Sequence, residues 1–195
     1  EDKHQDRKFD FMITNPPFGT SWKSEESFVK QEAKDIKGRF SAGVPKTNDG
    51  SFLFLQHLID KMEPTGSRIG IIFNNSPNQS GDAGSSESEI RKWLIEQDLL
   101  EAVIGLPNQM FFNTKLRTYI WILSNKKKVK RRNKIQLIDC YDYFEKMRKN
   151  LGEKGKYLNE NHIKSILNLY KNFENTSESK IFSNDDFRYF KIETY

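Results

Sequence analysis

The sequence predicts an α/β fold, half of a doubly wound domain with a mainly parallel sheet. Two observations indicate this. Short apolar runs, which suit strands buried on both faces, alternate with segments whose apolar residues recur at helical spacing. The order strand, helix, strand, helix, strand is typical of the β-α-β units that build such sheets. With 195 residues, the chain is long enough for one domain with a real core.

Five segments are expected to be strands, and the first three are continuously apolar. The last two are expected to pair as a hairpin between Arg117 and Asp139. The five segments are Phe9–Ile13, Arg68–Phe73, Leu100–Leu106, Arg117–Leu123 and Lys134–Asp139.

Three helices are expected from apolar stripes with N-terminal capping residues. Asp49 precedes the first stripe, and Pro64 ends it. Ser86 and Glu89 form a capping-box pattern before the second. Asn161 precedes the third, which is short and amphipathic.

The chain is expected to divide at about residue 140. Residues 1–140 carry the α/β pattern, whereas residues 141–195 are polar and less regular and read as a C-terminal extension. Its last aromatic segment, Phe187–Ile192, is expected to dock either on the body or on a partner subunit.

Composition narrows the class of protein. Cys140 is the single cysteine, so no disulfide framework is possible, and a cytoplasmic location is expected. The three histidines are scattered, so we expect no structural metal. No apolar run has the length of a membrane span, and no signal peptide or membrane association is expected. The net charge of +5 mildly favours a polyanionic partner.

Asn15-Pro16-Pro17-Phe18 is the most informative motif. Two prolines stop the first strand abruptly, since proline fixes φ and lacks a backbone N–H. The Asn15 amide, the Pro16 carbonyl and the Phe18 ring then project beyond the carboxyl end of a strand, where open α/β sheets bind ligands. Two acceptors and an aromatic face suit a planar base with an exocyclic amine. The alternative is a strand-terminating turn, because Asn and Pro are common turn residues.

Two polar segments offer candidate phosphate contacts. The loop from Gly38 to Gly50 is long and contains Arg39 and Lys46. A basic run over residues 126–134 has seven basic residues in nine. This run is either a solvated hairpin tip or a DNA-contacting element, for which the candidates are Lys127, Arg131 and Arg132.

The order of these segments resembles the methylation subunit of type I restriction–modification systems, an adenine-N6 DNA methyltransferase with a Rossmann-like fold. The resemblance runs through most of the chain. It rests on Lys8–Gly19, Asn48–His57, Gly70–Phe73, Glu89–Leu94, Ala102–Pro107, Phe111–Ile120, Ser179–Phe182 and Phe187–Ile192.

This resemblance implies roles for particular residues. Asn15, Pro16 and Phe18 would hold the target adenine, and Pro17 and Phe112 would help to bind the flipped base. The methyl donor would be S-adenosylmethionine. The implied partners are double-stranded DNA, a specificity subunit, a restriction subunit and a second methylation subunit.

The chain departs from the family's pattern in one respect. The family's Gly-rich cofactor-binding turn and its acidic ribose-binding residue normally precede the catalytic strand, and neither is found here. The cofactor-binding residues are therefore expected upstream of Glu1, and this chain is expected to be a fragment that lacks the cofactor-binding half and is inactive alone. The edge of the strand Phe9–Ile13 is expected to be capped by a second copy, a swapped segment or the chain's own tail.

Two other functions remain open from the sequence. The same motif serves methyltransferases that act on amines of RNA or amides of proteins. A non-catalytic DNA-binding or assembly module would keep the fold without the chemistry.

Overall fold

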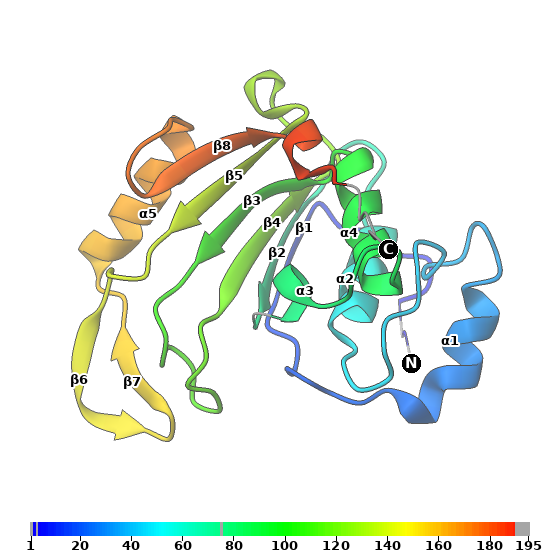
Figure 1. Ribbon diagram of the computed structural model, residues 1–195, viewed down its shortest axis with the longest axis horizontal. Coiled ribbons are helices and arrows are strands. Elements are labelled where there is room, and N and C mark those ends of the chain that lie inside the picture. Colours follow the sequence, from blue (N-terminus) through cyan, green and yellow to red (C-terminus); the bar gives the residue numbers. More distant parts are fainter. Residues whose placement is uncertain (1, 3, 75, 190–195) are drawn as a thin grey trace, which may run out of the picture.

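A mixed sheet of six strands forms the centre of the computed structural model, which describes residues 2, 4–74 and 76–189 (Figure 1). The strand order is β1-β2-β4-β3-β5-β8. Strands β1, β2, β3 and β5 run parallel to one another, and β4 and β8 run antiparallel to their neighbours. The six are β1 (Phe11–Thr14), β2 (Arg68–Phe73), β3 (Leu100–Gly105), β4 (Tyr119–Ser124), β5 (Lys134–Asp139) and β8 (Ser179–Ser183).

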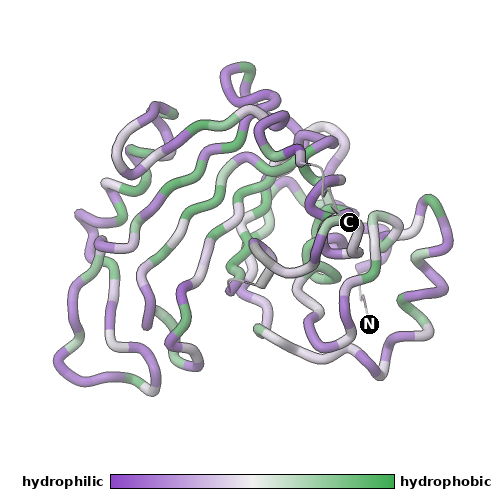
Figure 2. Tube along the Cα trace, viewed as in Figure 1, coloured by the Kyte–Doolittle hydropathy of each residue, from purple (hydrophilic) through white to green (hydrophobic). Residues whose placement is uncertain are grey.

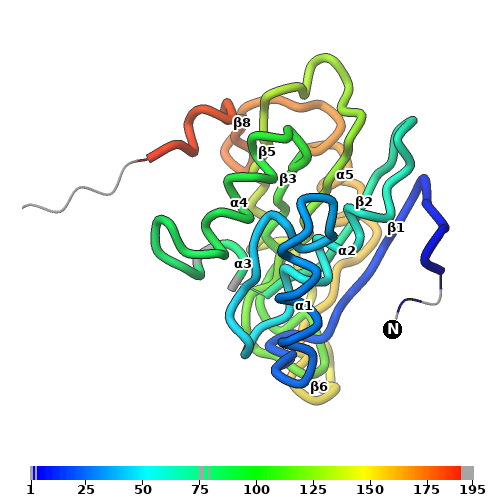
Figure 3. The backbone as a smooth tube through the Cα atoms, turned by 90° about the vertical axis from the view of Figure 1, so that its right-hand side faces the viewer, coloured from blue at the N-terminus to red at the C-terminus, as the bar shows by residue number. Residues whose placement is uncertain are grey.

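Helices cover both faces of this sheet. In the view of Figure 3, α4 and α5 lie on opposite sides of β3 and β5. The helices are α1 (Glu26–Glu32), α2 (Ser51–Asp60), α3 (Ser76–Gln79), α4 (Ser86–Glu96) and α5 (Glu160–Asn172). Short 3-10 turns span Lys23–Glu25, Val129–Arg131 and Asn184–Phe187. A separate hairpin pairs β6 (Glu145–Leu151) with β7 (Lys154–Tyr157).

The core follows the alternation of side chains along each strand. Trp121 of β4 packs with residues of α2 and α4, such as Leu55 and Leu94. Its neighbour Ile122 packs on the opposite face, in the cluster that contains Ile166 of α5. Figure 2 shows the hydrophobic residues gathered along the sheet strands, whereas β6, β7 and the connecting loops are mostly hydrophilic.

The predicted α/β fold is confirmed, and β2 and β5 have the predicted bounds. The residues that precede and cap the N-termini of these helices differ from those predicted. The side chain of Ser85 caps α4, that of Asn159 caps α5, and Gly50 precedes α2. Asp49 instead accepts hydrogen bonds from the backbone and the hydroxyl of Ser51.

The predicted hairpin between Arg117 and Asp139 is wrong, because β3 lies between β4 and β5. The connection over residues 125–133 passes over the start of β3 and is held there by Asp98. This carboxylate pairs with the ammonium of Lys127 at 2.6 Å and accepts a hydrogen bond from the backbone N–H of Asn133 at 2.9 Å.

Strand β1 forms one edge of the sheet, and one of its faces is uncovered. Phe11 and Ile13, on that face, are 77% and 91% exposed. The expectation that this strand is buried on both faces is therefore wrong for the described part of the chain. The tail does not cap this edge, since β8 pairs with β5 at the opposite edge. A second copy or a swapped segment at β1 stays a prediction.

The end of the described chain is integrated with the sheet. Besides the β8–β5 pairing, Ile166 of α5 is buried against β3 and β5, and Phe187 packs on the main core. Of the aromatic segment expected to dock, Phe190–Ile192 lies outside the described residues, as does Glu1 at the other end of the chain. The domain boundary at residue 140 stays a prediction.

Candidate functional site

The candidate site is the loop of residues 15–22, which we call the Asn15 loop. Strand β1 ends at Thr14, and Asn15 follows with an exposed side chain. Pro16 is buried, Pro17 is exposed and Phe18 is half-buried. Buried Pro16 and the rigid backbone of two prolines thus fix Asn15 at the strand end.

The far end of the Asn15 loop is tied to the loop that precedes α2. The Thr20 carbonyl accepts a hydrogen bond from the Gly50 N–H at 3.0 Å. Trp22 is buried and donates twice, from its backbone to the Thr47 carbonyl at 3.0 Å and from its indole to the Lys46 carbonyl at 2.9 Å. The Asn15 loop is therefore anchored at both ends.

An aromatic contact links the Asn15 loop to the loop after β3. The rings of Phe18 and Phe111 meet edge to face, with centroids 6.3 Å apart and planes at 88°. Phe111 also packs against the cluster under α5. Phe112, the residue predicted to wall the base, is 68% exposed, and its ring lies beside Gly152. Sequence reasoning missed Phe111 as the aromatic partner, and its only signal was adjacency to Phe112.

The hydrogen-bonding capacity of Asn15 and Pro16 is unused within the described residues. Neither the Asn15 amide oxygen nor the Pro16 carbonyl accepts a hydrogen bond there, whereas the Pro17 carbonyl accepts one from the Thr20 hydroxyl at 3.5 Å. Two free acceptors beside a half-buried ring can bind the NH₂ group of a flat molecule and leave its plane against Phe18.

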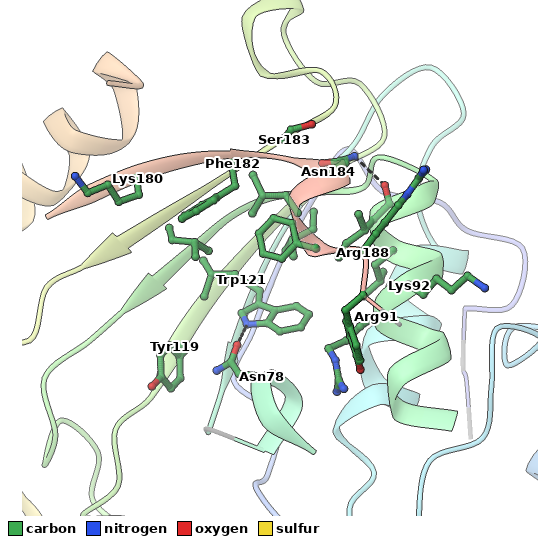
Figure 4. Close-up of a pocket in the computed structure, with 18 of the residues that line it drawn as sticks. Asn78, Arg91, Lys92, Tyr119, Trp121, Lys180, Phe182, Ser183, Asn184 and Arg188 are labelled. Atoms are coloured by element: carbon green, nitrogen blue, oxygen red, sulfur yellow. Dashed lines mark hydrogen bonds between the residues drawn. The ribbon is translucent and has the colours of Figure 1, made fainter. Parts of the chain in front are cut away.

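A large cavity lies elsewhere in the molecule. It has a volume of about 1280 Å³ and opens between α4, the turn Asn184–Phe187 and the sheet face formed by β3, β5 and β8 (Figure 4). The Trp121 indole points to Asn78, whose amide oxygen accepts its N–H at 3.1 Å. None of residues 15–18 lines this cavity. The candidate site is thus an open loop rather than an enclosed pocket.

The described residues offer neither a cluster of metal-binding side chains nor a helix that could span a membrane. They contain no group of three or more His, Cys, Asp or Glu side chains placed to hold a metal ion. The helices in this part of the chain are too short or too polar to cross a bilayer.

Burial raises the pKa of the Cys140 thiol to about 12, so this cysteine is a poor nucleophile.

The two candidate phosphate contacts near α1 and α2 differ. Arg39 forms a two-pronged ion pair with Glu32, at 2.5 Å and 2.6 Å, and this hydrogen bonding holds the pKa of Glu32 below its usual value. Its guanidinium also lies 3.0 Å from Nδ1 of His57. Lys46 has an exposed side chain. Arg39 therefore has a structural partner already, whereas Lys46 faces solvent.

Two of the three candidates in the basic run are buried, which corrects their assignment as DNA contacts. Lys127 is 6% exposed and pairs with Asp98. Arg131 is 3% exposed and lies 3.5 Å from the carboxylate of Glu101. A side chain enclosed in this way cannot reach a phosphate, and of the three only Arg132 is exposed.

The basic run also lies at the wrong end of the sheet. Strand β4 runs antiparallel to β2 and β3, so the run that follows it lies at the amino ends of the parallel strands. The Asn15 loop follows the carboxyl end of β1. Figure 1 shows the two loops at opposite ends, the basic run at the top and the Asn15 loop below β1.

This chain matches a known protein family along most of its length. The sequence profile described as N-6 DNA methylase matches residues 1–188, the whole α/β body and most of the extension. The chain belongs to the N-6 DNA methylase family.

Relatives within the N-6 DNA methylase family are similar along most of this chain. The methylase subunit of the MjaIX type I restriction enzyme from Methanocaldococcus jannaschii is 28% identical over 184 residues, which cover 93% of this chain and 31% of the relative. The HindI methylase subunit from Haemophilus influenzae is 33% identical over 138 residues, 71% of this chain and 29% of the relative.

A solved structure agrees with the fold. The type I restriction-modification methyltransferase subunit from Streptococcus thermophilus superposes with a TM-score of 0.77 at 25% identity, covering 94% of this chain and 36% of that one. The predicted resemblance to type I methylation subunits is confirmed. The chain spans about a third of the length of the relatives that it matches.

Two glycines of the sheet do not form the turn that S-adenosylmethionine, the cofactor that the family implies, would need. A nucleotide needs a close approach to the backbone at a glycine turn between strand and helix. Here Gly70 and Gly105 lie inside strands, and the Arg117 guanidinium occupies the space beside Gly105, 2.7 Å from where a Cβ would be. The acceptor role of the Asn15 loop and a cofactor site upstream of Glu1 both stay predictions.

Proposed function

We propose that this chain is the acceptor-base half of an adenine-N6 DNA methyltransferase, within the methylation subunit of a type I restriction–modification system. The observation that carries the proposal is the pair of unused acceptors, the Asn15 amide oxygen and the Pro16 carbonyl, beside the half-buried Phe18 ring. S-adenosylmethionine would be held by a part of the full-length subunit that precedes Glu1.

The chemistry follows from the acceptor's electronic structure. The lone pair of an adenine amine is delocalised into the ring, so the amine is a weak nucleophile. Two hydrogen bonds, one to Asn15 and one to Pro16, would take both amine hydrogens and favour tetrahedral nitrogen, which frees the lone pair for attack. The proton can leave after transfer, so no strong base is required at this position.

Phe18 would stack on the base once it has left the duplex. Enzymes that modify a base inside DNA must extrude it, and an aromatic face replaces part of the base stacking of the duplex. Phe111 supports this role because its edge-to-face contact holds the Phe18 ring in place. Pro17 and Phe112 complete the proposed set of base-binding residues.

The proposed partners follow from the relatives. Those described above are named methylase subunits of type I restriction enzymes, which supports a role in a multi-subunit assembly on duplex DNA. We propose a specificity subunit, a restriction subunit and a second methylation subunit as partners, in the cytoplasm.

Labelled methyl transfer tests the proposal. The full-length subunit, with its specificity partner, is incubated with labelled S-adenosylmethionine and with duplex DNA, RNA or protein, and the products are identified by mass spectrometry. N6-methyladenine in DNA is expected, and the isolated 195-residue chain is expected to be inactive. Label in RNA or in protein amides would mean that the substrate is RNA or protein rather than DNA. No methyl transfer to any of the three would favour a non-catalytic module.

A further inference from the structure

We propose that the β6–β7 hairpin contacts the phosphate backbone of duplex DNA next to the target base. The proposal rests on the proposed function, because it assigns the duplex a second contact at the same end of the sheet. The hairpin takes the DNA-contacting role that was first expected of the basic run. The position of that run and the burial of Lys127 and Arg131 exclude these two side chains from the role.

The hairpin lies at the carboxyl end of the sheet. Strand β5 runs parallel to β1 through β3 and β2, and the hairpin begins six residues after β5 ends at Asp139. Figure 1 shows it in yellow, extending beyond the sheet at the same end as the loop after β3. It is therefore on the side where the Asn15 loop would receive DNA.

Hydrogen bonds with the loop after β3 fix the hairpin in place. The backbone N–H of Glu153 donates to the Phe112 carbonyl at 2.9 Å, and that of Gly155 donates to the Gln109 carbonyl at 3.1 Å. The Lys156 ammonium donates to the Asn108 amide at 2.6 Å. An isolated two-stranded hairpin is marginal in water, so these bonds are what position it.

The close approach at the hairpin tip requires a glycine. Gly152 has a φ of +58°, and a Cβ there would lie 2.7 Å from the Phe112 carbonyl oxygen. Phe111, the residue before Phe112, contacts the ring of Phe18. A continuous series of contacts thus joins the hairpin to the base-binding loop.

The hairpin presents more positive charge than its own folding uses. Residues 145–157 contain five basic and two acidic side chains. Lys115 pairs with Glu153 at 3.2 Å, and Lys156 lies 3.7 Å from the centre of the Phe144 ring, so these charges have local partners. Three basic side chains of β6 remain exposed: Lys146, Arg148 and Lys149.

Duplex phosphate is the ligand that this surface fits. Of the seven residues of β6 only Met147 and Leu151 are apolar, and Met147 is half-buried, so the exposed surface of the strand is mainly polar and charged. Figure 2 shows the hairpin as mainly hydrophilic. Exposed Lys and Arg on a rigid support neutralise phosphates and position a protein on DNA without reading sequence.

Two matched triple variants of the full-length subunit test the assignment. K146Q/R148Q/K149Q neutralises the hairpin. K128Q/R132Q/K134Q removes two lysines and one arginine, also exposed, at the opposite end of the sheet. Binding to a non-specific duplex is measured at a series of salt concentrations, and circular dichroism checks the fold. Single variants K149Q and R148Q serve if the triple variant misfolds.

The hairpin triple is expected to weaken duplex binding at least severalfold at low salt. The slope of log Kobs against log salt should become shallower by about 0.9 for each phosphate that the variant no longer neutralises. The control triple should leave the slope unchanged. Equal slopes for the hairpin triple and the parent protein, equal weakening in both triples, or no duplex binding by the parent would overturn the proposal.

The outcome is separable from that of the proposed function. At saturating DNA the hairpin triple should retain methyl transfer, because its side chains do not touch the base. If the parent protein methylates DNA and the slope is unchanged, only the hairpin assignment fails. If the slope becomes shallower in the hairpin triple and neither the parent nor any variant methylates DNA, the hairpin binds DNA but the proposed chemistry is wrong.

Discussion

Phe111 and Phe112 are adjacent in the sequence but have different surroundings. Phe111 packs into the cluster beneath α5 and contacts Phe18, so it supports the ring that we propose binds the base. Phe112 is exposed and is available to a ligand. Removing each ring should therefore have a different effect, on stability for Phe111 and on substrate binding for Phe112.

Phe112→Ala should lower kcat/KM for methyl transfer about tenfold, because stacking of a base on an aromatic side chain contributes roughly 1–3 kcal/mol. The free energy of unfolding should change by less than about 0.5 kcal/mol, as is usual for exposed positions. Steady-state kinetics of the full-length subunit and urea unfolding measure the two quantities. Phe28→Ala, at a residue that is 59% exposed on α1, is the matched control. Unchanged kinetics for Phe112→Ala would remove this residue from the site.

Arg131 shows how burial reverses an interpretation based on charge. Its guanidinium stacks between the rings of Tyr170 and Phe173, at 4.3 Å and 4.2 Å from their centres. It also donates to the amide oxygen of Gln136 at 3.0 Å and faces Glu101, which is fully buried. The burial raises the pKa of Tyr170, which donates a hydrogen bond to Glu101, to about 12.

Arg131→Gln should destabilise the chain by about 3 kcal/mol, because it leaves the buried Glu101 carboxylate with fewer partners. Arg132→Gln, one residue along and exposed, should change stability by less than about 0.5 kcal/mol. Urea unfolding of the two variants makes the comparison. Similar stabilities would mean that the buried network contributes little to folding.

Residue patterns predicted the position of the Asn15 loop but not the burial of the basic residues. Two successive prolines disrupt strand pairing because neither donates a backbone hydrogen bond, so the loop could be placed from local rules. Whether Lys127 faces solvent depends on Asp98, which is 29 positions away in the sequence and pairs with it only after folding. No local signal could have distinguished Lys127 from the exposed Lys128.

At the scale of elements, strands were easier to predict than their pairing. The sequence patterns located β2 and β5 to the residue, since a charged residue begins each apolar segment and a polar or charged residue follows its last apolar one. The prediction that β4 and β5 pair as a hairpin was wrong, because strands that follow one another in the sequence are neighbours in the sheet only about two-thirds of the time. The helix caps were displaced by one or two residues because several Ser, Asn and Asp residues stand near each helix start.

The β6–β7 hairpin gave no strand signal. Its residues are charged on both faces and have little β-propensity, so neither alternation nor composition marks it. It forms because its turn and second strand bond to the carbonyls of Phe112 and Gln109. Structure imposed by another loop cannot be read from the segment itself.

Strand β1 carries an exposed apolar face at an open edge. Such an edge tends to pair with another chain. In the isolated 195-residue chain, Ile13→Lys should therefore reduce self-association, because it places a charge on the 91%-exposed face. Sedimentation velocity over a range of concentrations is the measurement. Ile36→Lys, at a residue that is 93% exposed in the loop after α1, should have no such effect. A parent chain that is monomeric at all concentrations would contradict the expectation that β1 is capped by another copy.

Across the whole molecule, we infer different roles for the two ends of the sheet. The carboxyl end bears the Asn15 loop, the loop with Phe111 and Phe112, and the exposed basic hairpin. The amino end bears the basic run, two of whose cations are built into the fold. We therefore assign both base binding and duplex contact to the carboxyl end, although the densest positive charge in the sequence lies at the other.

The single-turnover rate of methyl transfer by the full-length subunit tests the proposed role of Asn15 most directly. Asn15→Ala is compared with the parent and with Asn161→Ala, which removes an exposed amide from α5. Loss of a polar group aimed at the reacting atom costs on the order of a hundredfold or more in rate. We predict that loss for Asn15→Ala at saturating duplex DNA, with unchanged duplex affinity, and a parent-like rate for Asn161→Ala. A rate for Asn15→Ala close to that of the parent would contradict the claim that Asn15 holds the adenine amine.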